Sequence, residues 1–398
     1  KPMISNDSER GEAPLPPREV TYGWRRVGRL PLTQSLAPAI EAAENGFNSS
    51  EHYRTLVGYR LAAMQRDTET ARLFLRDNQA PEAGTLITQP DLANTLRAIA
   101  SNGRDGFYRG PVAEQLLRGV QAAGGVWQQQ DLDNYRVIAR RPIRFSSGGY
   151  QVISAPLPSA GGIALAGILQ ALPALPASPN RSIEQTHQLV ELMRRVYRDR
   201  AMLLGDNDFV SVPVAELTSK AYAVAMAQDI NPERATPSSE LGPLRDFHEG
   251  TNTTHFSLMD ADGNAVSATL SINLPFGAAF TPPGTGVLLN NFVYWTETDP
   301  ECQTPNRIEP GKRWSCCMAP LHVVDGDDFW FSIATPGSYG ILQTTMQMLL
   351  NIVEFGADVQ SAIEAPRFRV WEETRMQIED RVPEEVRRGL AALGPSLE

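Results

Sequence analysis

Apolar residues recur at three- and four-residue intervals through much of the first two thirds of the chain. This spacing is typical of helices that bury one face. It predicts helices over residues 35–47, 89–103, 110–125 and 182–203. Gly46 and Gly103 stand where two of these helices should end, because glycine readily adopts the left-handed conformation that closes a helix.

The period changes towards two in residues 131–156, which predicts a strand, a turn and a second strand. After Thr253 two alternating runs flank Asp260–Asn264, whose Asp-Gly pair predicts a hairpin. Further strands are expected over 286–294, 320–326 and 328–334, followed by a helix over 341–356. A helical first part and a strand-rich last part indicate an α+β fold with helices on the outer faces of antiparallel sheet.

Composition indicates a globular protein and argues against two classes of partner. Of 398 residues, 42% are hydrophobic and 21% are charged, and the formal net charge is −10. Nucleic acid is not expected, because phosphate contacts need clustered Lys and Arg. The short arginine runs in 140–144 and 194–200 are interpreted as solvated faces. No membrane span is expected, since no apolar run reaches about eighteen residues.

The sequence predicts no metal, no cofactor and no disulfide framework. The three cysteines are Cys302, Cys316 and Cys317, an odd number without metal-ligand spacing. The histidines form no HExxH pattern. Asp260–Asn264 is interpreted as a hairpin turn rather than a calcium loop, since its glycine is in the fourth position. Pro158–Gly167 lacks the spacing of a phosphate cradle and predicts a turn that leads into a helix.

Several polar positions leave a structural and a functional interpretation open. Thr335–Gly340 is either an ordinary turn or a turn whose successive amides stabilise an oxyanion. Asn273 is either a structural hydrogen-bonding residue or a substrate ligand. Arg10 forms either a surface salt bridge or a carboxylate-binding fork. His255 is interpreted as structural, because no GxSxG motif supports a Ser-His-Asp triad.

The strand that opens with Thr253, Thr254 and His255 differs from most other strand-like runs, which are bounded by Gly, Pro or Asp. One explanation is that threonine favours pleated structure. The other is that a threonine is placed where the chain will be cut. The surrounding motifs bear on this choice.

The last third of the chain contains the motifs TTHFSLMDADGNAVSATLSINLPFG, PGTGVLLNN, PGKR, TPGSYGI and AIEAPRFR. Earlier segments are PLTQSLAPAIEAAENGF, PSAGGI and GDNDFVSVP. In this order they closely resemble the gamma-glutamyltranspeptidase family of N-terminal nucleophile hydrolases, over nearly the whole chain. The resemblance implies an αββα four-layer sandwich, in which two antiparallel sheets are flanked by helices.

The resemblance also implies that the chain cuts itself between Asn252 and Thr253. Residues 1–252 and 253–398 would then be two chains of one structural domain, held together as a heterodimer. A freed α-amine has a reference pKa near ~8, so Thr253 would supply both the nucleophile and its base. Maturation and activity would therefore be coupled.

Further roles are implied residue by residue. Ser271 takes the place of a family threonine whose hydroxyl supports the nucleophile. Asn273 matches an asparagine beside the substrate. Gly337 and Ser338 stand where a Gly-Gly pair forms the oxyanion hole. Arg10 matches the arginine that grips the substrate α-carboxylate.

The chain departs from the family at the substrate. Cys316 and Cys317 replace two serines that contact the α-carboxylate, and thiols are weaker donors. Phe292 and Trp295 replace a glutamine and an aspartate, and the lost carboxylate contact is worth about 1.5–3 kcal/mol. The segment from Trp295 to Arg313 is short where the family often carries a lid loop, so an open site that admits bulky amides and water is expected.

The expected function is that of an autoprocessed gamma-glutamyltransferase or glutathione hydrolase, made as a zymogen and acting on a small amide. One alternative is an amidohydrolase or a cephalosporin- or glutaryl-type acylase with altered acyl specificity. Another is an unprocessed, non-catalytic binding paralogue. The resemblance implies a periplasmic or secreted location, while unpaired cysteines fit a cytoplasmic one equally well.

Overall fold

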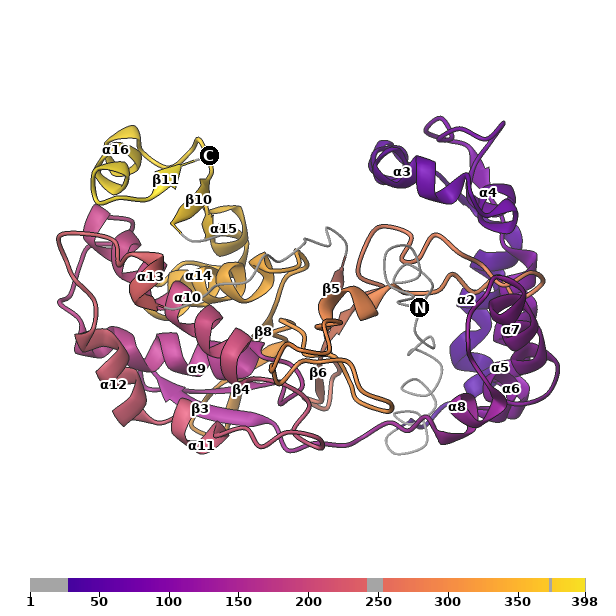
Figure 1. Cartoon of the computed structure of the whole chain (residues 1–398), viewed down its shortest axis with the longest axis horizontal. Coiled ribbons are helices and arrows are strands. Elements are labelled where there is room, and N and C mark those ends of the chain that lie inside the picture. The colour runs from indigo at the N-terminus through magenta and orange to yellow at the C-terminus, as the bar shows by residue number, and fades with distance from the viewer. Residues whose placement is uncertain (1–27, 242–252, 372–373, 398) are drawn as a thin grey trace. The chain divides into compact units, whose positions relative to one another are not determined.

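The computed structural model describes residues 28–241, 253–371 and 374–397. The chain divides into two compact units (Figure 1). The first unit comprises Lys1–Ala139 and Ile272–Tyr294, and the second comprises Arg140–Ser271 and Trp295–Glu398. Each unit therefore takes residues from both sides of the Asn252–Thr253 bond, and the expected scission there stays a prediction.

The first unit is helical, as its periodicity predicts. Its elements are α2 (Leu32–Asn45), β1 (Phe47–Asn48), α3 (Glu51–Met64), α4 (Thr68–Phe74), β2 (Leu86–Ile87), α5 (Pro90–Asn102), α6 (Asp105–Tyr108), α7 (Gly110–Ala122) and α8 (Gln129–Asn134). Gly46 ends α2 with φ 82°, and a Cβ there would lie 2.5 Å from the carbonyl oxygen of Ile87. Both the conformation and the close approach require glycine.

Residues 272–294 pack against these helices. Leu289 belongs to the same buried core as Phe107 and Leu116, and Thr95 Oγ1 donates to the Thr285 carbonyl at 2.7 Å. The expected strand over 286–294 is wrong. This segment forms no ladder with the strands that the structure describes, and it ends in the short helix η2 (Phe292–Trp295). Its apolar run is accounted for by burial against helices rather than by sheet pairing.

The second unit is built on a four-stranded antiparallel sheet in the order β3-β4-β7-β8. These strands are β3 (Ile143–Ser147), β4 (Tyr150–Ser154), β7 (Leu321–Asp325) and β8 (Asp328–Ile333). One sheet face packs against α9 (Gly161–Ala171), and the sheet shares one core with α9, α10 (Ile183–Leu203), α12 (Lys220–Gln228) and α14 (Gly340–Val353). The predicted strand pair in 131–156 and the two helices over 182–203 and 341–356 are confirmed.

Smaller elements complete this unit. They are η1 (Leu172–Ala174), α11 (Val214–Leu217), α13 (Ser238–Leu241), α15 (Val359–Glu364), β9 (Phe368–Val370), β10 (Arg375–Ile378), α16 (Glu384–Ala392) and β11 (Ser396–Leu397). β11, β10 and β9 form a separate sheet in that order. Met376 and Leu390 extend the shared core into this region.

The predicted hairpin is present as β5 (Thr254–Met259) and β6 (Ala265–Leu270). Asp260 closes its turn, because its Oδ1 accepts from the Asn264 amide at 2.8 Å. Ser257 Oγ lies 3.1 Å from Ser332 Oγ on β8. Ser332 alternates with Phe331 and Ile333, which face the helical core. The hairpin therefore meets the sheet on the face opposite to the helices.

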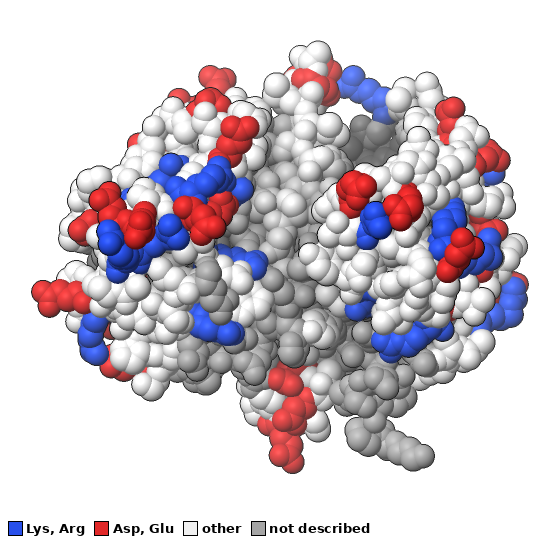
Figure 2. Space-filling view, turned by 90° about the horizontal axis from the view of Figure 1, so that it is seen from above, with Lys and Arg blue, Asp and Glu red and all other residues white. Residues whose placement is uncertain are grey.

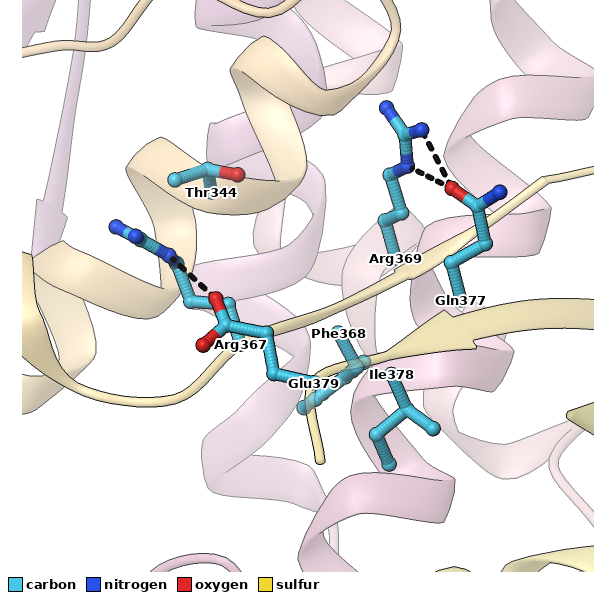
Figure 3. A pocket seen from close by; sticks show the side chains of 7 residues that line it. All are labelled: Thr344, Arg367, Phe368, Arg369, Gln377, Ile378 and Glu379. Atoms are coloured by element: carbon cyan, nitrogen blue, oxygen red, sulfur yellow. Dashed lines mark hydrogen bonds and ion pairs between the residues drawn. The ribbon is translucent and has the colours of Figure 1, made fainter. Parts of the chain in front are cut away.

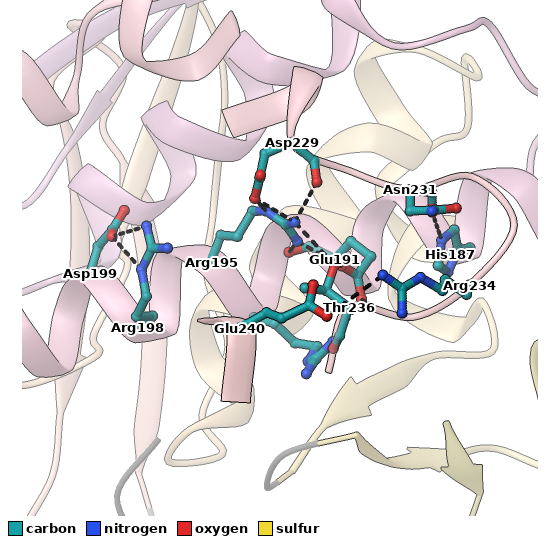
Figure 4. A network of polar contacts seen from close by, with 11 residues as sticks. His187, Glu191, Arg195, Arg198, Asp199, Asp229, Asn231, Arg234, Thr236 and Glu240 are labelled. Carbon is teal, nitrogen blue, oxygen red and sulfur yellow. Dashed lines mark hydrogen bonds and ion pairs between the residues drawn. The ribbon is translucent and has the colours of Figure 1, made fainter. Parts of the chain in front are cut away.

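The interpretation of residues 194–200 as a solvated face is wrong for Arg194 and Arg195, each 1% exposed. Both guanidinium groups donate to Glu191, at 2.7 and 2.6 Å. Figure 4 shows Arg195 between Glu191 and Asp229. Thr236 also donates to the Glu191 carboxylate, and Arg194 donates to the Thr236 carbonyl at 2.6 Å. The charges of both arginines are balanced by these partners, and their hydrogen bonds hold residues 229–238 against α10.

We predict that Glu191→Gln lowers the free energy of unfolding by about 3–5 kcal/mol at pH 7, since two buried cations lose their carboxylate. Burial raises the pKa of Glu191, but bonds from Thr236 and Arg195 and the nearby positive charges outweigh burial and lower it. A lowered folded-state pKa stabilises the protein above the unfolded pKa and loses this effect as pH falls. The difference in free energy of unfolding between the wild type and Glu191→Gln should therefore become smaller below about pH 4.3.

Urea denaturation at a series of pH values measures this difference. Glu233 is exposed and lies in the same segment, residues 229–238, so Glu233→Gln is the control. It should change the free energy of unfolding by less than about 0.5 kcal/mol. Equal stabilities of the two variants at pH 7 would contradict the role of Glu191.

Candidate active site

The hairpin places Thr253 and Ser271 side by side. Thr254 pairs with Leu270, so the next residue on each strand, Thr253 and Ser271, meets its counterpart at the open end. The Thr253 hydroxyl donates to Ser271 Oγ at 3.1 Å. Both residues are partly buried. The antiparallel register thus brings together the predicted nucleophile and its supporting hydroxyl, although they are 18 residues apart in sequence.

The turn between β8 and α14 contains the predicted oxyanion pair. Gly337 has φ 123° and Ser338 has φ 54°, so two consecutive residues adopt positive φ. The Gly337 carbonyl accepts from the Gly340 amide at 2.8 Å, and the Ser338 carbonyl accepts from Ile341 at 3.1 Å. A turn that engages its carbonyls in this way can aim its amides at one anionic oxygen.

Cys317 lies directly against this turn. Its thiol donates to the Ser338 carbonyl at 2.8 Å, and the side chain is buried. Cys316 is partly exposed, and its backbone bonds Pro158 and Ala160 at 3.1 and 2.8 Å. Burial raises the pKa of Cys316, so this side chain is a neutral thiol near pH 7. The two cysteines therefore have different surroundings: Cys317 bonds the turn, whereas Cys316 is held by its backbone against residues 158–160.

Trp295 forms an aromatic wall on the same turn. Its ring stacks on that of Tyr339, with centroids 4.9 Å apart and planes at 24°. The guanidinium carbon of Arg200 lies 5.4 Å from the Trp295 ring and 5.0 Å from the Tyr339 ring. The Asn306 amide also donates to the Trp295 carbonyl at 2.6 Å. Trp295 is therefore held in a defined position.

Sequence reasoning missed Tyr339 and Arg200. Tyr339 directly follows Gly337 and Ser338, the predicted oxyanion pair. This position in the sequence was a signal that the Tyr339 side chain would be held in place. Arg200 follows Val196 and Tyr197 at helical spacing of four and three residues, which is the pattern of a shared face. Both of those residues are buried, and Arg200 is only 5% exposed. Its charge led to the wrong expectation of a solvated face.

Asn273 and Phe292 belong to the other unit, so their expected role in substrate binding stays a prediction. Asn273 is buried with φ 73°, and its amide donates to the Asn291 carbonyl and to Asn291 Oδ1, both at 3.2 Å. Phe292 is also buried, and its amide donates to Asn290 Oδ1 at 3.1 Å. These bonds agree with the interpretation of Asn273 as a structural hydrogen-bonding residue, and its role as a substrate ligand stays a prediction. Arg10 and Asn252 lie outside the described residues.

His255 bonds Thr269 through Nδ1 at 3.0 Å and Ser257 through Nε2 at 3.1 Å. Burial lowers its pKa, so the ring is neutral near pH 7. These contacts lie within the hairpin and agree with the structural interpretation of this histidine. On this polar face, His255 and Ser257 are therefore hydrogen-bonded within the hairpin and to β8.

The structure adds three observations on ligands and partners. Within the described ranges, no three His, Cys, Asp or Glu side chains gather as metal ligands, and no helix is long and apolar enough to cross a membrane. On the face in Figure 2, basic side chains lie beside acidic ones. Arg140, from the first arginine run, pairs with Asp206 and Asp208 at 3.0 and 2.6 Å. Its charge is thus locally balanced.

A pocket of about 350 Å³ lies between α14 and the β9–β10 pair (Figure 3). Its lining residues are Thr344, Arg367, Phe368, Arg369, Gln377, Ile378 and Glu379. Arg369 donates to Gln377 Oε1 at 2.7 Å, and Arg367 lies 3.6 Å from Glu379. The residues predicted for the active site do not line this pocket.

Comparison with known proteins identifies the fold and the family. The profile of the family described as Gamma-glutamyltranspeptidase matches residues 17–398. The glutathione hydrolase proenzyme of Pseudomonas sp. (strain A14) is 36% identical over 360 residues, which cover 87% of this chain and 62% of that protein. The Acylase ACY 1 proenzyme of Pseudomonas sp. (strain V22) is 36% identical over 379 residues, which cover 94% and 67%.

A cephalosporin acylase from Bacillus halodurans superimposes with a TM-score of 0.88 at 26% identity, over 98% of this chain and 71% of that one. This likeness confirms the expected fold class, the αββα sandwich of the N-terminal nucleophile hydrolases. The chain belongs to the gamma-glutamyltranspeptidase family. It spans 62% of the length of the relative from strain A14.

We predict that Cys317→Val destabilises the protein by about 0.5–1.5 kcal/mol, because the Ser338 carbonyl loses the thiol donor and keeps the Ile341 amide. Cys317→Ser keeps a donor of similar size and should retain most of the stability. Thermal unfolding of both variants measures the difference. The control is Cys302→Val, in a loop away from this turn. A Cys317→Val variant as stable as Cys317→Ser would show that the thiol bond contributes nothing.

Proposed function

We propose that this protein is an autoprocessed amide hydrolase or acyl transferase of the gamma-glutamyltranspeptidase type, with Thr253 as its nucleophile. The observation that carries the proposal is the Thr253–Ser271 hydroxyl pair at the open end of the hairpin. Family membership supports it, and both relatives named above are called proenzymes. A proenzyme is what this chemistry requires, because the base is created by chain scission.

Maturation comes first in this mechanism. While Thr253 is bonded to Asn252, its nitrogen is an amide and cannot accept a proton. Cleavage of that bond frees an α-amine with a reference pKa near ~8. The amine and the hydroxyl belong to one residue, so the base is within reach of the nucleophile without any histidine.

Turnover then follows an acyl-enzyme route. Thr253 Oγ attacks the substrate amide carbonyl and gives its proton to the α-amine. The Ser271 hydroxyl, 3.1 Å away, orients Thr253 Oγ for this attack. The amides of Gly337 and Ser338 hold the oxyanion, and the departing amine takes the proton from the α-ammonium. Water or a second amine then attacks the ester and restores Thr253.

The two processed chains are proposed to stay together as a heterodimer. Leu192 and Val196 on α10 precede the cut, whereas Leu342 and Met346 on α14 follow it. All four belong to one buried core. Separation would expose this shared apolar surface to water, at about 25 cal/mol per Å². The exported location expected from the family resemblance is also part of the proposal, and cell fractionation of the full-length product tests it.

A second candidate concerns the acyl group. Trp295 is fixed by Tyr339 and presents an indole where the family resemblance implies an ammonium-binding carboxylate. Asn306 further restrains its backbone. An indole offers an apolar surface, so an acyl group without an α-ammonium, such as a glutaryl group, fits this wall better than a γ-glutamyl group. The chain is 36% identical both to a protein named as an acylase and to one named as a glutathione hydrolase, so the comparison is compatible with this specificity and the Trp295 contact carries it.

We expect Thr253→Ala to remain one uncut chain without amide turnover, because it lacks the nucleophile for both steps. Thr253→Ser keeps a hydroxyl and should still be cut. Intact mass and N-terminal sequencing measure cleavage, and release of amine from a chromogenic amide measures turnover. A cut or active Thr253→Ala protein would refute the proposed nucleophile.

Acyl preference gives a separate prediction. The wild type should hydrolyse a glutaryl amide at least about tenfold better than the matching γ-glutamyl amide, judged by kcat/KM, because one charge-assisted bond is missing. Trp295→Asp should narrow this ratio, whereas Trp295→Phe should preserve it. A wild-type preference for glutathione would overturn the altered acyl specificity but leave the nucleophile unaffected.

A further inference from the structure

Arg200 connects the aromatic wall to the turn that follows β8. Its Nη1 donates to the Tyr339 hydroxyl at 2.9 Å, and its Nη2 donates to the Ser315 carbonyl at 3.2 Å. Its guanidinium carbon is within 5.4 Å of the ring centroids of both Trp295 and Tyr339. These distances fall in the range of cation–π attraction. One buried side chain therefore contacts two residues that are 44 positions apart.

Tyr339 transmits this contact to the backbone of the turn. It directly follows Ser338 and stands at the start of α14. The Tyr197 hydroxyl donates to the Tyr339 carbonyl, and Gln343 donates to the Tyr197 hydroxyl at 3.2 Å. Burial raises the pKa of Tyr339, although the Arg200 cation lowers it, so the phenol is neutral near pH 7. Both ends of Tyr339 are thus restrained.

The turn needs such restraint because its conformation is unfavourable. A residue with a Cβ, such as Ser338, pays about 1–2 kcal/mol in the left-handed region. Cys317 holds the Ser338 carbonyl at 2.8 Å, and Tyr197 holds the next carbonyl. Each carbonyl shares a planar peptide group with the amide of the next residue, so these two contacts fix the peptide planes that follow Ser338 and Tyr339. The Ser338 amide directly precedes the first of these planes, and loss of the restraint would let the Ser338 backbone leave its positive φ and move this donor out of line.

We propose that Arg200 is a positioning residue that couples Trp295 to Tyr339. The aromatic wall at Trp295 and the turn with Gly337 and Ser338 then form one rigid unit. Binding of the substrate acyl group against Trp295 then affects how the Gly337 and Ser338 amides are aligned. Arg200 reaches the substrate only through these neighbours. The kinetic part of this inference rests on the proposed function, whereas the rigidity of the turn does not.

Arg200→Lys is the central variant, because lysine keeps the charge but loses the planar group that contacts both rings. We expect kcat to fall about 10- to 100-fold, while KM for a small amide changes less than about threefold. Tyr197→Phe removes only the hydroxyl on the Tyr339 carbonyl, so its kcat should fall less. Arg198→Lys is the matched control on the same helix, since Arg198 pairs with Asp199 and is partly exposed. It should retain wild-type kinetics.

Hydrogen exchange of the peptide spanning 335–341 provides a readout that is independent of activity. Exchange should be at least about tenfold faster in Arg200→Lys, intermediate in Tyr197→Phe and unchanged in Arg198→Lys. Unchanged exchange and unchanged kcat in a folded Arg200→Lys protein would overturn the proposal. If Arg200→Lys does not fold, unchanged exchange and unchanged kcat in Tyr197→Phe would overturn it.

The two proposals can fail separately. A wild type without amide turnover would refute the proposed function, and the exchange comparison would still decide whether Arg200 holds the turn. A wild type with turnover, together with an Arg200→Lys variant of equal kcat and lower thermal stability, would assign Arg200 a purely structural role and overturn the coupling.

Discussion

The antiparallel register of β5 and β6 is the constraint on which the candidate site depends. It sets Thr253 against Ser271 and directs His255 and Ser257 towards β8, with Phe256 on the other face. Because side chains alternate along a strand, a slip of one residue would exchange these faces. The closed Asp260 turn and the Ser257–Ser332 contact both oppose such a slip. The proposed nucleophile is thus placed by backbone pairing rather than by side-chain packing.

The other part of the site depends on α10 and α14. The core between these helices fixes Tyr197 and Arg200 behind Tyr339, and therefore behind the turn that carries Gly337 and Ser338. Charged groups enter this region only with partners: Glu191 and its two arginines farther along α10, and Arg200 against aromatic rings. Rigidity at the turn comes from these buried polar contacts as well as from apolar packing.

The departures from the family motifs lie at the proposed acyl-binding residues, whereas the proposed nucleophile Thr253 is retained. Trp295 presents an indole and Cys317 presents a thiol that is used by the turn. Neither side chain supplies the charge or the strong donors that an α-amino acid group needs. This geometry agrees with the proposal that the same acyl chemistry acts on an acyl group without an α-ammonium.

Periodicity and turn chemistry are local, so the main helices and the hairpin could be predicted from the sequence alone, whereas the Thr253–Ser271 pair was expected from the family resemblance. The sequence also indicated the turn at Gly337 and Ser338. Only the tertiary structure decided that residues 286–294 form no sheet ladder among the described strands, that Arg194, Arg195 and Arg200 are buried, and that Tyr339 joins Trp295 to the turn. Burial of a charge depends on partners brought from distant segments, such as Thr236 for Glu191 and Tyr339 for Arg200. Such partners leave no periodic signal in the chain.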